Sequence, residues 1–424
     1  MNGPLDEVKE DNGPVSTVFS GLDVDCCIVG GGPCGMMAGL LLARAGVRVA
    51  VLEKHVDFLR DFRGDTVHPS TLEVMAELGM LDELLKRPHT ELKELTGDFF
   101  GKRVKLADFS ELGTTAPFVA LMPQWDFLDF LARQAAKLPQ FTLLMGSEAR
   151  SLVFDQGRVV GVRAAHAQGV VEVRAKATVV ADGRDSLMRK QAGLPLRSYH
   201  SAVDVLWFRL SRTPEDGDQA LGHVSRGCVL VLLNRGEYWQ CACVVEKGRA
   251  QYYEQEGIES LRAKLRPILP LPPERLEELD GWNRVKLLSV EVNRLRRWAR
   301  PGMLCIGDAA HAMSPVGGIG INLAVQDAVA AARLLTPLLR AGRTPSLWQL
   351  KRVQRRRSFV THLTVRLQLL IQNQFLSGRL HDTSARIPWP VALLNRSPWL
   401  RRAAARFIGL GLRREHVPAS AAAG

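Results

Sequence analysis

Residues 23–53 read DVDCCIVGGGPCGMMAGLLLARAGVRVAVLE, and this stretch decides the fold. Its apolar run over 23–29 predicts a buried strand, and the glycine-rich segment 30–35 predicts a tight turn. An apolar helix is expected over 36–45, followed by a second strand over 47–52. Strand, glycine turn, helix and strand in this order predict the opening unit of a dinucleotide-binding α/β fold.

The turn has the spacing GxGxxG, and each glycine has its own steric role. Gly30 would make the turn, Gly32 would let a pyrophosphate approach the backbone, and Gly35 would let the helix meet the strand. Glu53, at the end of the second strand, is placed to hold both ribose hydroxyls of an adenosine. A tight structural turn with a surface glutamate is the alternative, but the flanking strand and helix favour nucleotide binding.

A second motif, DGRDSLMR, occupies residues 182–189 and follows a strand expected over 175–181. By itself, Asp-Gly is a generic turn. Just before that strand, residues 150–174 alternate as short strands around a turn at 155–157. This pattern predicts a β-meander inserted into a parallel sheet.

A third motif, GMLCIGDAAHAMSPVGGIGIN, occupies residues 302–322. It predicts a short apolar strand, a carboxylate, and a glycine-rich turn that opens a helix over 323–335. Such a turn exposes backbone N–H groups at a helix N-terminus, which suits an anionic ligand edge. Asp308 at the strand end can accept hydrogen bonds from a chain of hydroxyls.

Together the three motifs resemble those of the class A FAD-dependent aromatic monooxygenases, the para-hydroxybenzoate hydroxylase-like flavoproteins. The resemblance covers about residues 23–340 and implies a Rossmann-like FAD-binding domain with a β-meander, an antiparallel-sheet substrate domain and C-terminal helices. The expected division is a tail over 1–21, an FAD-binding domain over 22–85, 115–198 and 286–345, a substrate sheet over 86–114 and 199–285, and a basic helical region over 346–424.

The resemblance also implies an FAD site, residue by residue. Arg63 resembles the arginine that reaches toward the FAD diphosphate and the nicotinamide cofactor, with Arg60 as a competing candidate. Ile321 and Asn322 would place backbone N–H groups near the N1–O2 edge of the flavin ring. The full expected set is Gly30, Gly32, Pro33, Gly35, Glu53, Lys54, Arg63, Gln124, Asp182, Gly183, Asp308, Pro315, Gly318, Gly320, Ile321 and Asn322.

The family chemistry implied is reduction of bound FAD by NADPH or NADH, addition of O2 to give a flavin C4a-hydroperoxide, and oxygen transfer to an aromatic, polycyclic or quinone-precursor molecule. The chain lacks a second GxGxxG followed by an acid, which matches transient nicotinamide binding. The alternatives are an FAD-dependent reductase of the geranylgeranyl-reductase type acting on a lipid, and a non-enzymatic FAD-bound interaction protein. A flavin-dependent halogenase is disfavoured because the sequence Trp-x-Trp-x-Ile-Pro is absent.

Between residues 199 and 283 the pattern becomes antiparallel, with β-rich runs over 202–210, 228–233 and 238–245 and a returning strand over 285–292. In the family such a sheet covers the flavin and lines the substrate pocket. No catalytic residue or general base is assigned, and His311 is expected to pack structurally beside the flavin. The substrate candidates, each of which could equally be sheet packing or solvent face, are Trp207, Arg209, His223, Tyr238 and Gln240.

The composition indicates the cellular compartment of the protein and the kinds of ligand it binds. The 424 residues include seven cysteines without a CxxC pair, which disfavours a zinc site or a disulfide framework and fits a reducing cytoplasm. No signal peptide or membrane span is expected. We expect a monomer or homodimer that binds a small molecule and neither a metal nor nucleic acid.

The net positive charge of the chain comes from the C-terminal region, because the charges of residues 1–345 balance. From residue 346 onward, Lys351 and thirteen arginines face only Asp382 and Glu415, a surplus equal to the net charge of +12 of the whole chain. Apolar residues recur at helical spacing over 359–370 and 399–410. Two interpretations of these helical patterns stay open. The helices could pack on the flavin domain with a solvated arginine face, or a basic helix could make peripheral contact with the inner face of a membrane.

Overall fold

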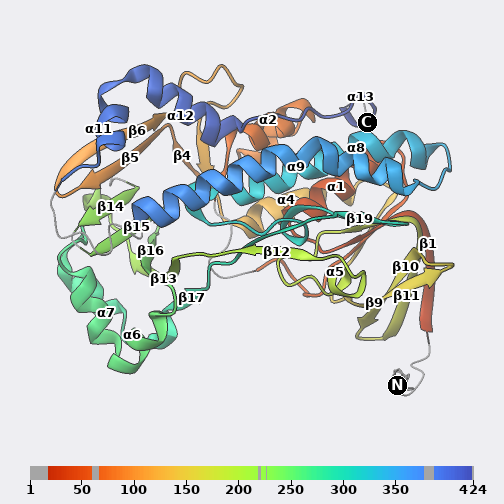
Figure 1. The fold of residues 1–424 in the computed structure, drawn as a ribbon, viewed down its shortest axis with the longest axis horizontal. Coiled ribbons are helices and arrows are strands. Elements are labelled where there is room, and N and C mark those ends of the chain that lie inside the picture. Colours follow the sequence, from red (N-terminus) through yellow and green to blue (C-terminus); the bar gives the residue numbers. More distant parts are fainter. Residues whose placement is uncertain (1–17, 60–65, 218–220, 226, 377–385, 423–424) are drawn as a thin grey trace, which may run out of the picture.

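The computed structural model describes residues 18–59, 66–217, 221–225, 227–376 and 386–422. Two sheets lie at opposite ends of an elongated molecule, and long helices run between them (Figure 1). Arg60 and Arg63, the two candidates for the diphosphate contact, lie outside the described residues.

The first sheet has eight strands and a parallel centre. β1 begins inside the segment expected to be a tail, because Val18 and the residues after it pair with the third strand of the meander. The order of the parallel strands is β20 (Met303–Cys305), β11 (Gly169–Val180), β1 (Val18–Val29), β2 (Val49–Leu52) and β8 (Phe141–Leu144).

The predicted β-meander is present beside this parallel centre. β9 (Glu148–Asp155) and β10 (Arg158–His166) form an antiparallel pair, and β10 also pairs with β11. Gln156, in the predicted turn, has a positive φ of 46°. At the other edge, β19 (Ala299–Arg300) runs antiparallel to β20.

Helices complete the core of this half. α1 (Pro33–Arg44) contacts both α4 (Gln124–Ala135) and α8 (Ile319–Arg340). Of the helices in the described part of the chain, only the stretch Val316–Arg340 is long and apolar enough to cross a membrane. Because 72% of its most apolar window is buried, it is the core helix of this half.

The second sheet combines strands from residues 94–108 with strands from residues 203–288. α6 (Ala250–Glu256) and α7 (Ile258–Leu265) belong to the apolar cluster on one of its faces. The other face points toward the glycine-rich turn before α8. The strand order is β17 (Lys286–Leu288), β13 (Val203–Ser211), β16 (Tyr238–Glu246), β15 (Cys228–Asn234), β14 (Gly222–Ser225), β5 (Glu94–Phe99) and β6 (Lys102–Asp108).

The returning strand expected over 285–292 is divided into two. β17 pairs with β13 in the second sheet, whereas β18 (Val292–Leu295) pairs with β12 (Leu196–Tyr199) in a separate ribbon. Between them, the Val290 N–H donates to the buried carboxylate of Asp204 at 2.9 Å. That bond holds the chain where it passes from one sheet to the other.

Smaller elements connect the two halves. They are β3 (Thr66–Val67), β7 (Val119–Leu121) and β4 (Thr90–Leu92) in a small sheet, and the helices α2 (Pro69–Glu77), α3 (Leu81–Leu84) and α5 (Leu187–Gln191). Among them, β3 brings Thr66 against the glycine-rich turn of the third motif and pairs with β7, whereas α5 packs on β9 of the first half.

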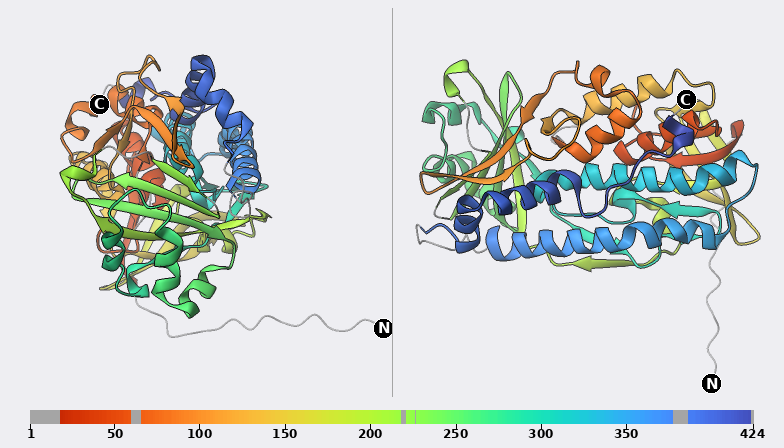
Figure 2. Two further views of the ribbon diagram at one scale, coloured as in Figure 1. Left: turned by 90° about the vertical axis from the view of Figure 1, so that its left-hand side faces the viewer. Right: turned by 90° about the horizontal axis from the view of Figure 1, so that it is seen from above.

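The basic C-terminal region is helical. α9 (Leu347–Leu370) runs beside α8 along the long axis, and α11 (Trp389–Arg396) and α12 (Pro398–Leu410) follow (Figure 2). The chain then returns to the first sheet, where α13 (Ala419–Ala422) contacts α1. The apolar stripe of α9 faces outward: Phe359 is 70% exposed, while Arg357 is fully buried.

We expect Gly39→Ala to lower the thermal unfolding midpoint. Its Cβ would lie 2.8 Å from the Phe141 ring and 2.9 Å from Val51, too close for a well-packed interface between α1 and the sheet. Overpacking costs about 1–3 kcal/mol, more than the gain in helix propensity of about 1 kcal/mol. Gly21→Ala is the control, because its Cβ meets nothing within 4 Å. Equal midpoints for both variants would contradict this packing.

Candidate active site

The motifs converge because their strands are neighbours in the parallel sheet. Glu53 follows β2, the turn 30–35 follows β1, Asp182 follows β11, and Asp308 follows β20. These four strands are adjacent and parallel, so their carboxyl ends open on one edge. Ligands of open α/β sheets bind at that edge.

The glycine turn is closed toward the protein and open toward the ligand side. Gly30 has a φ of +103°, and a Cβ there would overlap the carbonyl of Ala181, the residue after β11. A Cβ on Gly35 would overlap the Gly30 carbonyl oxygen. A Cβ on Gly32 would meet nothing within 4 Å. The turn therefore leaves free space at the position expected to receive a pyrophosphate, just before Pro33 begins α1.

Glu53 is held in place by backbone donors. It is 8% exposed, and its carboxylate accepts from the Gly31 N–H at 2.8 Å and from the His55 N–H at 3.0 Å. This arrangement fixes the acid beside the glycine turn, where ribose hydroxyls would need acceptors. Lys54, the next residue, is exposed.

Asp182 offers a buried acceptor. Within the described residues its Oδ1 has no hydrogen-bond partner, and burial raises the pKa of this carboxyl. The neighbouring Gly183 has a φ of +90°. Such an orphaned oxygen fits a hydroxyl or amide donor of a bound cofactor.

Arg189 joins the second motif to the third. Its backbone N–H donates to Ser186 Oγ at 3.0 Å, which caps α5, and its guanidinium donates to the Ala309 carbonyl at 3.0 Å. Arg189 is 2% exposed. In the same region, the Arg184 guanidinium lies 3.9 Å from the Asp308 carboxylate.

The turn before α8 presents a helix N-terminus. Gly318 caps α8 with a φ of +63°, and a Cβ there would overlap Thr66 Oγ1, which itself donates to the Gly318 carbonyl at 3.0 Å. No side chain of the described residues caps this end. The N–H groups of the first turn, including that of Ile321, therefore stay available to an anionic edge.

The side chain of Asn322 has a different task from its backbone. Its Oδ1 accepts from the His68 N–H at 2.8 Å and from Thr71 Oγ1 at 2.7 Å. Its amide donates to the carbonyls of Thr66 and Gly318, each at 3.2 Å. Asn322 thus clamps residues 66–71 to the glycine-rich turn, a role that the sequence did not reveal.

The remaining cofactor candidates border this edge. Gln124 is the first residue of α4 and is half-buried. Pro315 precedes the glycines of the turn, and at Gly320 a Cβ would meet only Met313, at 3.9 Å.

The residues at this edge fit the FAD that the motifs imply. The backbone at Gly32 is open to a pyrophosphate, Glu53 is oriented toward a ribose, and the Asp182 oxygen lacks a hydrogen-bond partner among the described residues.

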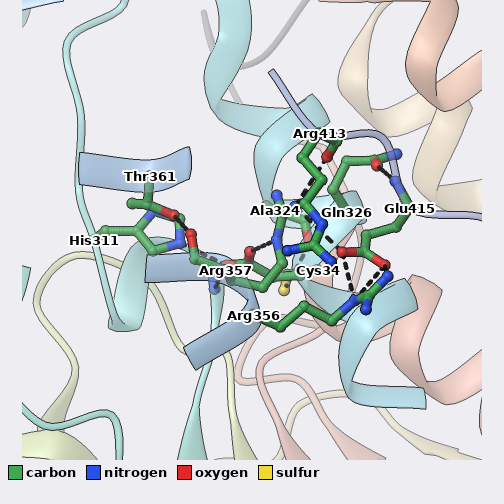
Figure 3. Close-up of polar contacts among 11 residues, drawn as sticks. Cys34, His311, Ala324, Gln326, Arg356, Arg357, Thr361, Arg413 and Glu415 are labelled. Carbon is green, nitrogen blue, oxygen red and sulfur yellow. Dashed lines mark hydrogen bonds and ion pairs between the residues drawn. The ribbon is translucent and has the colours of Figure 1, made fainter. Parts of the chain in front are cut away.

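A buried charge cluster that the sequence did not predict contacts the third motif, residues 302–322, which we now call the flavin motif (Figure 3). Asp327 of α8 accepts from Arg357 Nε at 2.8 Å and from the Gly307 N–H at 3.2 Å, and lies 2.5 Å from His311 Nε2. Burial opposes ionisation of Asp327, but His311 and Arg357 outweigh it and hold the pKa of this carboxyl below its ordinary value.

The C-terminal segment closes this cluster. Glu415 accepts from Arg356 Nε at 2.8 Å and lies 3.7 Å from Arg357, and its own N–H donates to Gln326 at 2.5 Å (Figure 3). The one sequence signal for this cluster is Asp327 itself, a carboxylate within the apolar helix expected over 323–335, and it does not identify Arg357 as the partner. His311 is buried and packs against Trp298 at 5.2 Å, which agrees with a structural role.

Four of the five substrate candidates share one face of the second sheet. Cross-strand pairing places Trp207 opposite Ala242, Arg209 opposite Gln240, and Tyr238 opposite Ser211, all away from α7. The Arg209 guanidinium stacks on the Tyr238 ring at 4.8 Å.

The fifth candidate lies on the opposite face. His223 pairs with Leu230, which packs in the cluster under α7. Arg235, in the turn between β15 and β16, joins the first group, because its Nε donates to Gln240 at 3.0 Å.

Comparison with known proteins gives the class. The FAD binding domain family matches residues 23–366, and the chain belongs to that family. It is an FAD-dependent monooxygenase of the para-hydroxybenzoate hydroxylase-like class, an oxidoreductase that uses NAD(P)H and O2 on aromatic molecules.

Among individual relatives, the chain is 32% identical to 6-methylpretetramide 4-monooxygenase of Streptomyces rimosus, over 90% of this chain and 91% of that protein. The fold is similar to PqsL, a probable FAD-dependent monooxygenase from Pseudomonas aeruginosa (TM-score 0.73, 22% identity, 88% of this chain and 100% of that chain). It is also similar to the anhydrotetracycline hydroxylase OxyS of Streptomyces rimosus (TM-score 0.72, 23% identity, 94% of this chain and 77% of that chain).

We expect Gly32→Ala to fold normally and to lose FAD. The new Cβ has free space in the protein but would stand where the pyrophosphate must approach, so FAD affinity should fall about tenfold or more. FAD titration by flavin fluorescence measures this. Gly35→Ala is the matched variant, which should instead lower the thermal midpoint, because its Cβ overlaps backbone. Wild-type FAD affinity in Gly32→Ala would refute the assignment.

We expect Asp327→Asn to lower the free energy of unfolding by about 3–5 kcal/mol, because it removes the carboxylate that is hydrogen-bonded to the buried Arg357 and leaves only Glu415, at 3.7 Å, to balance the charge. Asp129→Asn, at an exposed pair with Arg133, should cost less than about 1 kcal/mol. Since the pKa of Asp327 is lowered in the fold, its contribution is full at neutral pH and is lost as pH falls below the ordinary value of 3.8. Denaturant unfolding at neutral and acid pH tests both statements, and equal losses in the two variants would contradict them.

Proposed function

We propose that this enzyme hydroxylates a polycyclic aromatic molecule or a quinone precursor. The observation that carries the proposal is the meeting of all the motifs at the carboxyl ends of four adjacent parallel strands. The 32% identity to an enzyme named for 6-methylpretetramide, over nine-tenths of this chain, supports a polycyclic substrate. Bound FAD would supply reduction by NADPH or NADH and activation of O2.

In this proposal the chain positions the cofactor along the sheet edge. The turn 30–35 receives the pyrophosphate, Glu53 holds the ribose, and Asp308 and Gln124 contact the part nearer the ring, with Arg63 as the candidate for the diphosphate. The positive end of α8 would stabilise negative charge on the ring. The FAD-binding part would comprise 22–85, 115–198 and 286–345, and the substrate part 86–114 and 199–285.

The second sheet would supply the substrate contacts. Trp207 packs against the apolar cluster that includes Met313 and Ile319 beside the glycine-rich turn of the third motif, so it is placed to exclude water from the reacting atoms. Arg209 and Gln240 form the polar part of the same face, which favours a substrate with an acidic oxygen such as a phenolate or enolate. A cytoplasmic monomer or homodimer is the setting that we propose.

Turnover assays test the proposal. The purified protein should show a flavin spectrum, and a polycyclic phenol should stimulate NADPH or NADH oxidation with labelled oxygen from O2 appearing in the product. A colourless protein that takes up no added FAD would end the proposal. Substrate reduction without oxygen incorporation would favour the reductase alternative.

We expect Arg209→Ala to raise the KM for a phenolic substrate about tenfold, since a hydrogen bond to a charged group contributes about 1.5–3 kcal/mol. The methyl ether of the same phenol should respond less, because it carries no acidic oxygen. Arg249→Ala removes an arginine stacked at the same 4.8 Å on a tyrosine, Tyr252, and serves as the control. An equal rise in KM for the phenol and for its methyl ether would show that Arg209 does not bind the acidic oxygen.

A further inference from the structure

One face of α9 is exposed along its whole length and is both apolar and basic. Its apolar members are Trp348 (56% exposed), Phe359 (70%), Leu363 (40%) and Leu370 (48%). Together with Arg352, Arg355 and Arg366 they follow one another at steps of three and four residues, which places all of them on one side of the helix. Arg352, Arg355 and Arg366 are exposed at the positions between them, and we call these seven residues the α9 face.

The helix has this orientation because its other side makes buried polar contacts as well as buried apolar ones. Arg357 binds Asp327, and the Gln368 amide donates to the carbonyls of Ser314 at 3.1 Å and Val316 at 2.8 Å, within the flavin motif. Turning α9 to bury Phe359 would break these buried contacts. The exposed apolar stripe is therefore a fixed property of the fold.

The α9 face carries positive charge alone. α9 contains no acidic residue, and its three exposed arginines form no ion pair within the described part of the chain. Arg352 and Arg355 stack on Trp348 at 5.4 and 5.9 Å. On the flank of the helix, burial and the nearby Arg294, Arg366 and Arg197 lower the pKa of His362, in keeping with positive potential there.

α11 and α12 extend the same character beside the C-terminal half of α9 (Figure 2). Trp389 is 77% exposed, Trp399 is 71% exposed and Leu393 is 47% exposed. Arg396 and Arg406 are exposed near them, whereas Arg402 pairs with Glu111. Large exposed aromatic side chains gathered with arginines are unusual on a monomer surface.

We propose that the α9 face docks on an anionic lipid bilayer. Tryptophan, phenylalanine and leucine beside arginine match the headgroup boundary, where apolar side chains enter the acyl region and guanidinium groups meet lipid phosphates. At 1.5 Å per residue α9 is about 36 Å long, so it would lie flat on the surface.

A second copy of the chain fits the α9 face less well. Pairing two such faces would bring arginines together without an acid on either helix, and like charges repel. The sequence supports an anionic partner further, because the region after residue 345 holds a surplus of charge equal to the whole net charge of +12.

Co-sedimentation of the FAD-loaded full chain with vesicles tests the proposal. The protein should bind vesicles of phosphatidylcholine with phosphatidylglycerol, bind pure phosphatidylcholine weakly, and dissociate as salt is raised. Arg352→Ala and Arg355→Ala should each lower the partition coefficient about fivefold, and Phe359→Ser about tenfold. Leu287→Ser, at an apolar residue 51% exposed on β17, and Arg133→Ala on α4 are matched controls expected to bind like wild type.

Equal binding to anionic and neutral vesicles, or wild-type binding by the α9 variants, would overturn the proposal. So would a wild-type dimer that Phe359→Ser converts to a monomer by light scattering, because the occupant would then be a second copy. FAD content and NADPH oxidation are measured on the same preparations. Their loss in wild type would refute the proposed function and leave the vesicle result standing.

Discussion

The buried carboxylate of Asp327 is the interaction on which the rest of the structure depends. It receives the Gly307 N–H at the start of the flavin motif, the His311 ring and the Arg357 guanidinium. A single side chain of α8 therefore fixes the flavin turn and attaches α9. Such a cluster holds only when every buried charge has its partner, because an unpaired buried charge costs several kcal/mol.

This requirement explains an arrangement that hydrophobicity alone would not produce. Burying a phenylalanine or leucine stabilises a fold by about 1.5–3 kcal/mol, and α9 leaves Phe359 and Leu363 in solvent. The buried side of the same helix places Arg357 against Asp327 and Gln368 against two carbonyls of the flavin motif. These polar contacts, together with the buried valines of that side, decide the rotation of the helix. The apolar stripe is a consequence of the way in which the flavin turn is held.

Much of the cofactor side could be predicted from the sequence, because each motif is a local pattern whose glycines and acids have steric or hydrogen-bonding roles within a few residues. The parallel strands, the β-meander and the helix of the third motif were found in this way. The clamp of Asn322 on Thr71 and the bond of Arg357 to Asp327 join residues 251 and 30 positions apart. No local pattern encodes such pairs. The face of His223 was equally hidden, since alternation gives two faces without saying which one meets the flavin turn.

The sequence by itself determined the class of cofactor and the strands that carry its motifs, because a GxGxxG turn between strand and helix has few other physical uses. Only the tertiary structure decided which residues surround that site from a distance, which four substrate candidates share a face, and which side of α9 meets solvent. The physical reason is the same in each case. Local spacing fixes backbone conformation, whereas the partner of a buried charge is chosen by packing between segments far apart in the chain.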